Sequence, residues 1–135
     1  MLVEARDVDM DRQRVAQKLV FLAKELVAGR YSVKKDFITK KGVEFEAGDG
    51  LEVDEYINKG IGHAVRLVTR DGRAVVLPVS LAHKIVSGFP KPPSVGTMTR
   101  WVENGVARSV DGQRVEPDGY SRNGAPSWLL AMGMI

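Results

Sequence analysis

The segment that most constrains the fold of this 135-residue chain is His63–Val79, in which two runs of β-favouring residues flank Asp71-Gly72. An Asp-Gly pair between such runs predicts a β-hairpin, because both central residues of a type I′ turn adopt positive φ. With a two-residue loop, Leu67 faces Val76 across the strands. Both hairpin faces would then be partly apolar, so we expect the hairpin to be central and covered on both sides.

Composition indicates a globular protein of ordinary type, with 44% hydrophobic and 27% charged residues. The net charge of +3 and the pI of about 9.3 suit an anionic partner without requiring one. The chain has no cysteine, which excludes disulfides, thiolate metal sites and cysteine nucleophiles. The absence of cysteine also fits a reducing compartment.

The first residues, MLVEARDVDMDRQ, are charged throughout and do not contain the apolar region of a secretory signal. The apolar run Leu19–Ala23 is bounded by Lys18 and Lys24, and it is too short to span a bilayer. We therefore expect a cytoplasmic protein that does not insert into a membrane.

Residues 10–28 are predicted to form an amphipathic helix, because Leu19, Leu22 and Leu26 recur on one helical face. Phe21 lies off this apolar stripe. Two interpretations of Phe21 stay open: a partly exposed aromatic side chain, or a contact with a second subunit or a partner.

Residues 31–58 alternate between apolar and polar side chains and predict two or three short strands. Lys41-Gly42 and residues 48–50 are the expected turns. Together with the hairpin, these strands favour a small antiparallel sheet. The predicted fold class is α+β, with the N-terminal amphipathic helix on an SH3-like barrel or bent sheet, followed by a C-terminal helix plus β-hairpin unit.

The C-terminal unit begins after the stiff link FPKPP. Before the link, Ser80–Val86 is predicted as a short helical turn that Ser80 can cap, with Leu81 and Ile85 four residues apart. After it, we expect a helix over Thr97–Asn104, then a hairpin over residues 106–115 with Asp111-Gly112 at its tip. The chain is predicted to be a single domain over residues 1–135, and the link offers a possible subdivision into 1–88 and 94–135.

The chain closes on the apolar segment Trp128–Ile135, which must be buried somewhere. It packs either in the core of this chain or against a neighbouring chain. The second alternative defines a candidate partner or oligomer interface, with residues Phe21, Trp128, Leu129, Leu130, Met134 and Ile135.

Catalytic chemistry finds little support in the sequence. His63 and His83 do not have the spacing of a metal-ligand pair, and a strand-edge and a surface histidine explain them. The carboxylates Glu52, Asp54 and Glu55 are typical of a solvated strand face. We therefore expect no enzyme activity, no catalytic residue, no bound metal and no cofactor.

Basic side chains suggest a binding role more strongly. Arg66, Arg70 and Arg73 alternate along the central hairpin, where Arg70 and Arg73 would pair across the turn. Like charges in such a pair are unfavourable unless an anion lies nearby or the side chains can splay apart. Phosphate groups are one such anion, and they would make binding sensitive to salt.

Residues 80–116 resemble a minimal winged helix-turn-helix of the excisionase and MerR-type families. The matching segments are SLAHKIV as first helix, SVGTMTRW as second helix and VARSVDGQRVEP as wing. This resemblance implies that Thr97 and Arg100 touch DNA, that Trp101 is buried, and that Arg108 and Arg114 contact phosphates. The link between the two helices is longer and stiffer than the tight turn of those families.

The start VAQKLVFLAKELVAG and the end EPDGYSRNGAPSWLLAMGMI resemble small proteins of bacteriophages and mobile elements. From these features we expect a non-enzymatic binding protein of phage origin, acting in the host cytoplasm, with nucleic acid as the leading partner. The alternative is a protein–protein interaction module: a virion or assembly component, or an inhibitor of a host or defence protein.

Overall fold

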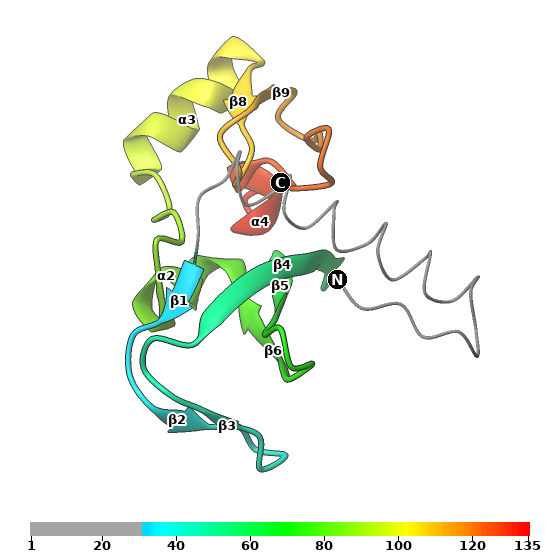
Figure 1. Ribbon diagram of the computed structural model, residues 1–135. Coiled ribbons are helices and arrows are strands. Elements are labelled where there is room, and N and C mark those ends of the chain that lie inside the picture. Colours follow the sequence, from blue (N-terminus) through cyan, green and yellow to red (C-terminus); the bar gives the residue numbers. More distant parts are fainter. Residues whose placement is uncertain (1–30) are drawn as a thin grey trace, which may run out of the picture.

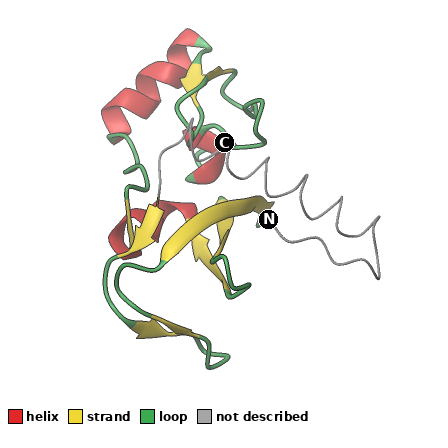
Figure 2. Ribbon diagram, in the orientation of Figure 1, coloured by secondary structure: helices red, strands yellow, loops and turns green. Residues whose placement is uncertain are grey.

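The computed structural model describes residues 31–135, so the helix predicted over residues 10–28 and Phe21 lie outside the described residues. The described part is a mixed α and β structure in which a curled antiparallel sheet of five strands is accompanied by three helices (Figures 1 and 2). The prediction of a mixed fold with a bent antiparallel sheet is therefore confirmed.

The sheet has the order β6-β5-β4-β1-β7, and every neighbouring pair is antiparallel. In β4 the register shifts between Val53 and Glu55, and such a bulge increases the local bend and twist of a strand. The five strands are β1 (Tyr31–Val33), β4 (Gly50–Asn58), β5 (His63–Val68), β6 (Ala74–Pro78) and β7 (Val86–Ser87).

A separate hairpin extends from the sheet at the bottom of Figure 1. It consists of β2 (Phe37–Ile38) and β3 (Glu44–Phe45), which pair with Phe37 opposite Phe45. The two rings stack with their centroids 4.9 Å apart. This contact lets a hairpin of two short strands pack as a unit.

The β5–β6 turn lies where the sequence predicted it, but its type differs. The Thr69 N–H donates to the Arg73 carbonyl at 2.9 Å, and the Gly72 N–H donates to the Thr69 carbonyl at 3.1 Å. Only glycines have positive φ among the described residues, and Gly72 is one of them, at 92°. This is a three-residue loop, so the predicted two-residue type I′ turn was wrong.

The longer loop changes which side chains share a face. Leu67 pairs with Val75 instead of Val76, and both side chains are buried. On the other face Arg66 pairs with Val76, which is 47% exposed. The exposure of Val76 shows that this face of the hairpin is not covered, and β6 is an edge strand of the sheet and not a central one. The expectation of a central hairpin covered on both faces was therefore wrong.

The helices of the C-terminal half begin with α2 (Val79–Ile85). Pro78 precedes it without a side-chain cap, so the predicted Ser80 cap was wrong. Its buried residues are Val79 and Ala82, Ile85 packs partly against the core, and Leu81 is 44% exposed. The two apolar residues Leu81 and Ile85, although four positions apart, therefore differ in burial.

The predicted helix and hairpin after the proline-rich link are confirmed. α3 (Val95–Asn104) is capped by the Ser94 hydroxyl, which accepts the Thr97 N–H at 3.2 Å, and it ends at Gly105 with φ 70°. The hairpin consists of β8 (Ala107–Arg108) and β9 (Arg114–Val115).

The short helix α4 (Trp128–Ala131) lies between the sheet and the unit formed by α3 and the β8–β9 hairpin (Figure 1). Trp128 is 4% exposed and Leu129 is fully buried, so this part of the chain end packs in its own core. The same cluster of buried residues includes Leu67 of the sheet and Met98 of α3. Apolar packing thus continues across the proline-rich link.

Candidate nucleic-acid interface

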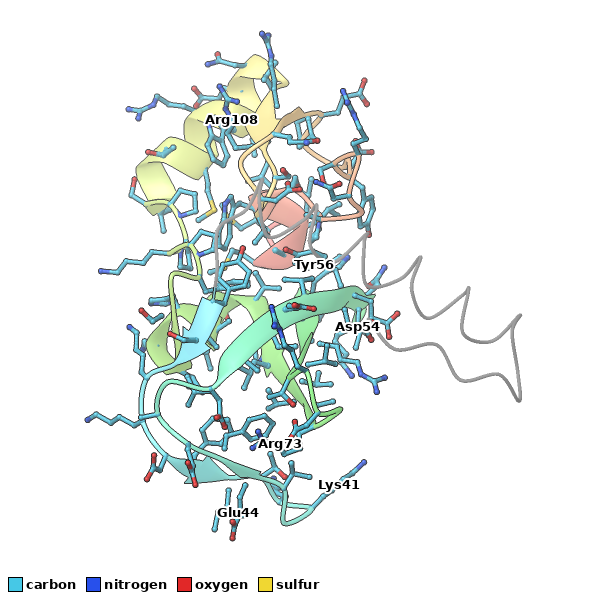
Figure 3. All side chains as sticks on the ribbon, viewed as in Figure 1. Lys41, Glu44, Asp54, Tyr56, Arg73 and Arg108 are labelled. Atoms are coloured by element: carbon cyan, nitrogen blue, oxygen red, sulfur yellow. The ribbon has the colours of Figure 1, made fainter. Side chains whose placement is uncertain are left out.

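The structure separates the predicted nucleic-acid-binding residues into two groups. Arg66, Arg70 and Arg73 belong to the β5–β6 hairpin, near β2–β3. The second group is on α3 and the β8–β9 hairpin, at the opposite end of the molecule; Figure 3 labels one arginine of each group. The second group consists of Thr97, Arg100, Arg108 and Arg114.

Arg73 is engaged within the protein. Its Nε lies 3.0 Å from the Asp71 carboxylate, and its Nη1 donates to Asp49 at 3.1 Å and to the Glu44 carbonyl at 2.6 Å. The guanidinium group also lies 5.4 Å from the centroid of the Phe45 ring. These contacts join the β5–β6 turn to β3 and compensate the positive charge.

The neighbours of Arg73 are more exposed. Arg66 lies 3.5 Å from Asp54 in an exposed ion pair, which contributes little to stability. Arg70 is exposed in the loop. The Thr69 hydroxyl and then Arg73 lower the pKa of Asp71 below its ordinary value by hydrogen bonding.

On the β8–β9 hairpin, Arg108 lies directly opposite Arg114. The Arg108 Nη1 donates to the Gly112 carbonyl at 3.3 Å, and both side chains are exposed. Within residues 31–135, no carboxylate forms an ion pair with either arginine or with Arg100. A cross-strand pair of like charges is unfavourable by itself and becomes favourable when an anion binds between the guanidinium groups.

A hollow of about 260 Å³ lies beside these two arginines. Trp101 and Asn104 face it from α3, and Trp101 is half-buried against the core. We call it the Trp101 hollow, and its lining residues are Trp101, Asn104, Val106, Ala107, Arg108 and Arg114. An aromatic surface, an amide and two cations thus meet at one site, and the lining includes no carboxylate.

The exposed face of α3 continues this surface. Met98 is the one fully buried residue of the helix, while Arg100 is exposed and donates from Nη2 to the Thr97 hydroxyl at 3.4 Å. Thr97 and Arg100 are one turn apart on the same side of α3. The structure therefore brings Thr97 together with Arg100, and Arg108 together with Arg114.

A polar network holds the β8–β9 turn in place. Asp111 accepts hydrogen bonds from the hydroxyl of buried Ser109, from the Ser121 hydroxyl at 2.9 Å and from the Asn123 amide at 3.2 Å. The Ser109 hydroxyl in turn accepts the Gln113 N–H at 2.9 Å. This network fixes the strands on which Arg108 and Arg114 lie.

The histidines occupy separate positions. The Nε2 of His63 lies 2.8 Å from the Tyr120 hydroxyl, and its Nδ1 lies 3.3 Å from the Leu130 carbonyl, which links β5 to the C-terminal unit. The Nδ1 of His83 is buried and has no hydrogen-bond partner. No group of three or more potential metal ligands occurs within residues 31–135.

The described residues of the predicted partner interface differ in burial: some belong to the core and others are exposed. Trp128 and Leu129 are part of the core, and Leu130 is half-buried. Met134 and Ile135 are 39% and 52% exposed, so these two residues are the surface part of the segment.

Comparisons with protein-family models, with curated proteins and with solved structures found no match. None of the helices described in residues 31–135 has the length and apolarity needed to cross a membrane. The case for a function therefore depends on the geometry of the site.

Proposed function

We propose that this protein binds nucleic acid through the surface formed by α3 and the β8–β9 hairpin. The observation that supports this most directly is the position of Arg108 opposite Arg114 at the rim of the Trp101 hollow. A phosphate bound between the two guanidinium groups would convert an unfavourable like-charge pair into two charge-assisted contacts.

Trp101 and Asn104 extend the proposal from the phosphate to the base. Proteins that bind unpaired nucleic acid stack bases on aromatic side chains beside a cationic surface. The ring of Trp101 supplies such an aromatic surface, and the amide of Asn104 supplies hydrogen-bonding groups for a base edge. Thr97 and Arg100 would contact the backbone of the same strand further along α3.

The helix-turn-helix interpretation enters this proposal only in part. The order α2, α3 and β8–β9 follows the resemblance, with α3 as the helix that contacts nucleic acid. However, α2 packs against β5, β6 and β7 of the sheet. The proposal therefore rests on α3 and the β8–β9 hairpin and assigns no role to α2.

Tryptophan fluorescence tests this proposal. Adding a single-stranded DNA or RNA oligonucleotide should quench Trp101 emission, while Trp128, at 4% exposure, provides a constant background. Trp101→Phe should abolish the quenching, and the double variant Arg108→Glu with Arg114→Glu should weaken binding by at least about tenfold.

Arg70→Glu is the control, because it makes the same type of substitution, once, on an exposed loop at the other end of the molecule. It should leave the affinity close to that of the unmodified protein. Equal binding by the unmodified protein and the Arg108/Arg114 variant would refute the proposed surface, provided that both unfold at similar temperatures.

A further inference from the structure

The edge strand β6 has backbone groups available for pairing. Among the strands of residues 31–135 it pairs only with β5, and the Arg73 carbonyl accepts the Thr69 N–H at the start of that ladder. Alternation in an antiparallel ladder then directs Val75 and Leu77 toward β5, and Val76 away from it. Within residues 31–135, Val76 makes no backbone hydrogen bond outside the sheet. Its N–H and C=O are therefore free to pair with an added strand.

A groove of about 650 Å³ runs between β6 and the β2–β3 hairpin. Its apolar side chains include Ile38, which is 65% exposed, and Val76, which is 47% exposed. Its charged side chains are Lys40, Lys41 and Arg66, and no carboxylate lines it. We call this the β6 groove. Figure 3 shows Lys41 at the end of the β2–β3 hairpin, distant from Arg108, which lines the Trp101 hollow.

We propose that the β6 groove binds an extended peptide segment of a partner protein, in which acidic and apolar side chains alternate. The segment would add as a strand to β6, with main-chain hydrogen bonds to Val76. Side chains on one face of this strand would contact Ile38 and Val76, and carboxylates would face Lys40 and Lys41.

Charge favours this occupant over a second copy of the chain. Pairing of two β6 edges by two-fold symmetry would bring two cationic grooves against each other, and like charges across an interface oppose association. Carboxylates on an added acidic segment would instead complement Lys40 and Lys41, while Arg66 is already paired with Asp54. The proposal is independent of nucleic-acid binding, because the groove and the Trp101 hollow have no lining residue in common.

The test uses the full chain and a fluorescent, end-blocked heptapeptide of alternating glutamate and valine, with fluorescence anisotropy as the readout. We expect saturable binding. A peptide with lysine in place of glutamate should bind at least about tenfold more weakly. A glutamate–valine peptide that is N-methylated at alternate amides, so that it cannot donate to β6, should lose binding altogether.

Val76→Pro is the corresponding protein variant, since it removes the outward N–H while the bonds to β5 remain. It should abolish binding, whereas Val76→Thr, which keeps the N–H and nearly the same shape, should bind. The double variant of Lys40→Glu with Lys41→Glu should bind the acidic peptide more weakly.

Three results would overturn the proposal. They are no binding of the acidic peptide, equal binding of the lysine or N-methylated peptide, and a dimer in sedimentation that Val76→Pro dissociates. The third result would assign the edge to a second copy of the chain.

Discussion

At the scale of single residues, the half-buried side chain of His83 has surroundings that oppose a positive charge. Its Nδ1 is buried without a partner. Burial, followed by the positive charges of Lys84, Lys91 and Lys34, lowers the pKa of His83 below 6.5. The unfolded chain therefore binds a proton at a higher pH than the folded protein does. The stability that comes from neutral His83 is present above pH 6.5 and is lost as the pH falls toward the folded-state pKa.

The unfolding temperature should accordingly decrease when the pH is lowered from about 7.5 to about 5.5. His83→Gln, which cannot gain a proton, should reduce this fall, and Lys84→Met should reduce it less because only one nearby charge is removed. Thermal unfolding by circular dichroism at both pH values measures the difference. An identical fall in His83→Gln and in the unmodified protein would contradict this account.

At the scale of elements, four turns have the same construction. In each, a serine or threonine accepts the N–H of the residue four positions later, and a glycine with positive φ stands three positions after it. The shared geometry is that of a three-residue loop, in which only the glycine needs positive φ. The four turns are Thr39–Val43, Thr69–Arg73, Ser109–Gln113 and Ser121–Ala125.

Two glycine substitutions should therefore have opposite effects. Gly112, with φ 88° and open space around it, should lose about 1 kcal/mol of stability when replaced by alanine, through backbone strain alone. Gly96 is in the first turn of α3 without positive φ, so Gly96→Ala should gain up to about 1 kcal/mol. Urea unfolding measures both, and a change of the same sign in the two variants would contradict the assigned turn and helix.

The local sequence pattern predicted where the helices, strands and turns lie better than it predicted which of their faces are buried. Asp71-Gly72 and Asp111-Gly112 marked both turns, and the helix expected over Thr97–Asn104 ends where α3 ends and begins within two residues of its start. The loop length was missed because it depends on the serine or threonine before each Asp-Gly pair, a signal that was present in the sequence. That one-residue change determines which side chains of β6 are buried.

The candidate site was harder to predict because it depends on how distant elements pack together. The sequence analysis selected Arg108 and Arg114 as separate residues. Their position directly opposite each other follows from the three-residue loop, which sets the register of the two strands. The Trp101 hollow could not be predicted, because it forms only where α3 packs beside β8. The resemblance to winged helix-turn-helix proteins implied that Trp101 is buried, whereas its side chain is half-buried and lines the hollow.

At the scale of the whole molecule, two binding surfaces are proposed at opposite ends of one fold (Figure 1). The Trp101 hollow has two arginines for an anionic ligand, and the β6 groove lies beside β2–β3. The core that includes Leu67, Met98 and Leu129 holds the two ends together. Such an arrangement would allow nucleic acid and a protein segment to bind at the same time.

The measurement that tests the central claim most directly is the salt dependence of oligonucleotide binding, followed by fluorescence anisotropy. The logarithm of the affinity should fall linearly with the logarithm of the salt concentration. The double variant of Arg108→Gln with Arg114→Gln should reduce the slope by about 1.4 to 1.8, since each lost phosphate contact contributes about 0.7 to 0.9. Arg70→Gln should leave the slope unchanged. A slope that is the same in the unmodified protein and the double variant, or an equal reduction by Arg70→Gln, would contradict the assignment of this surface.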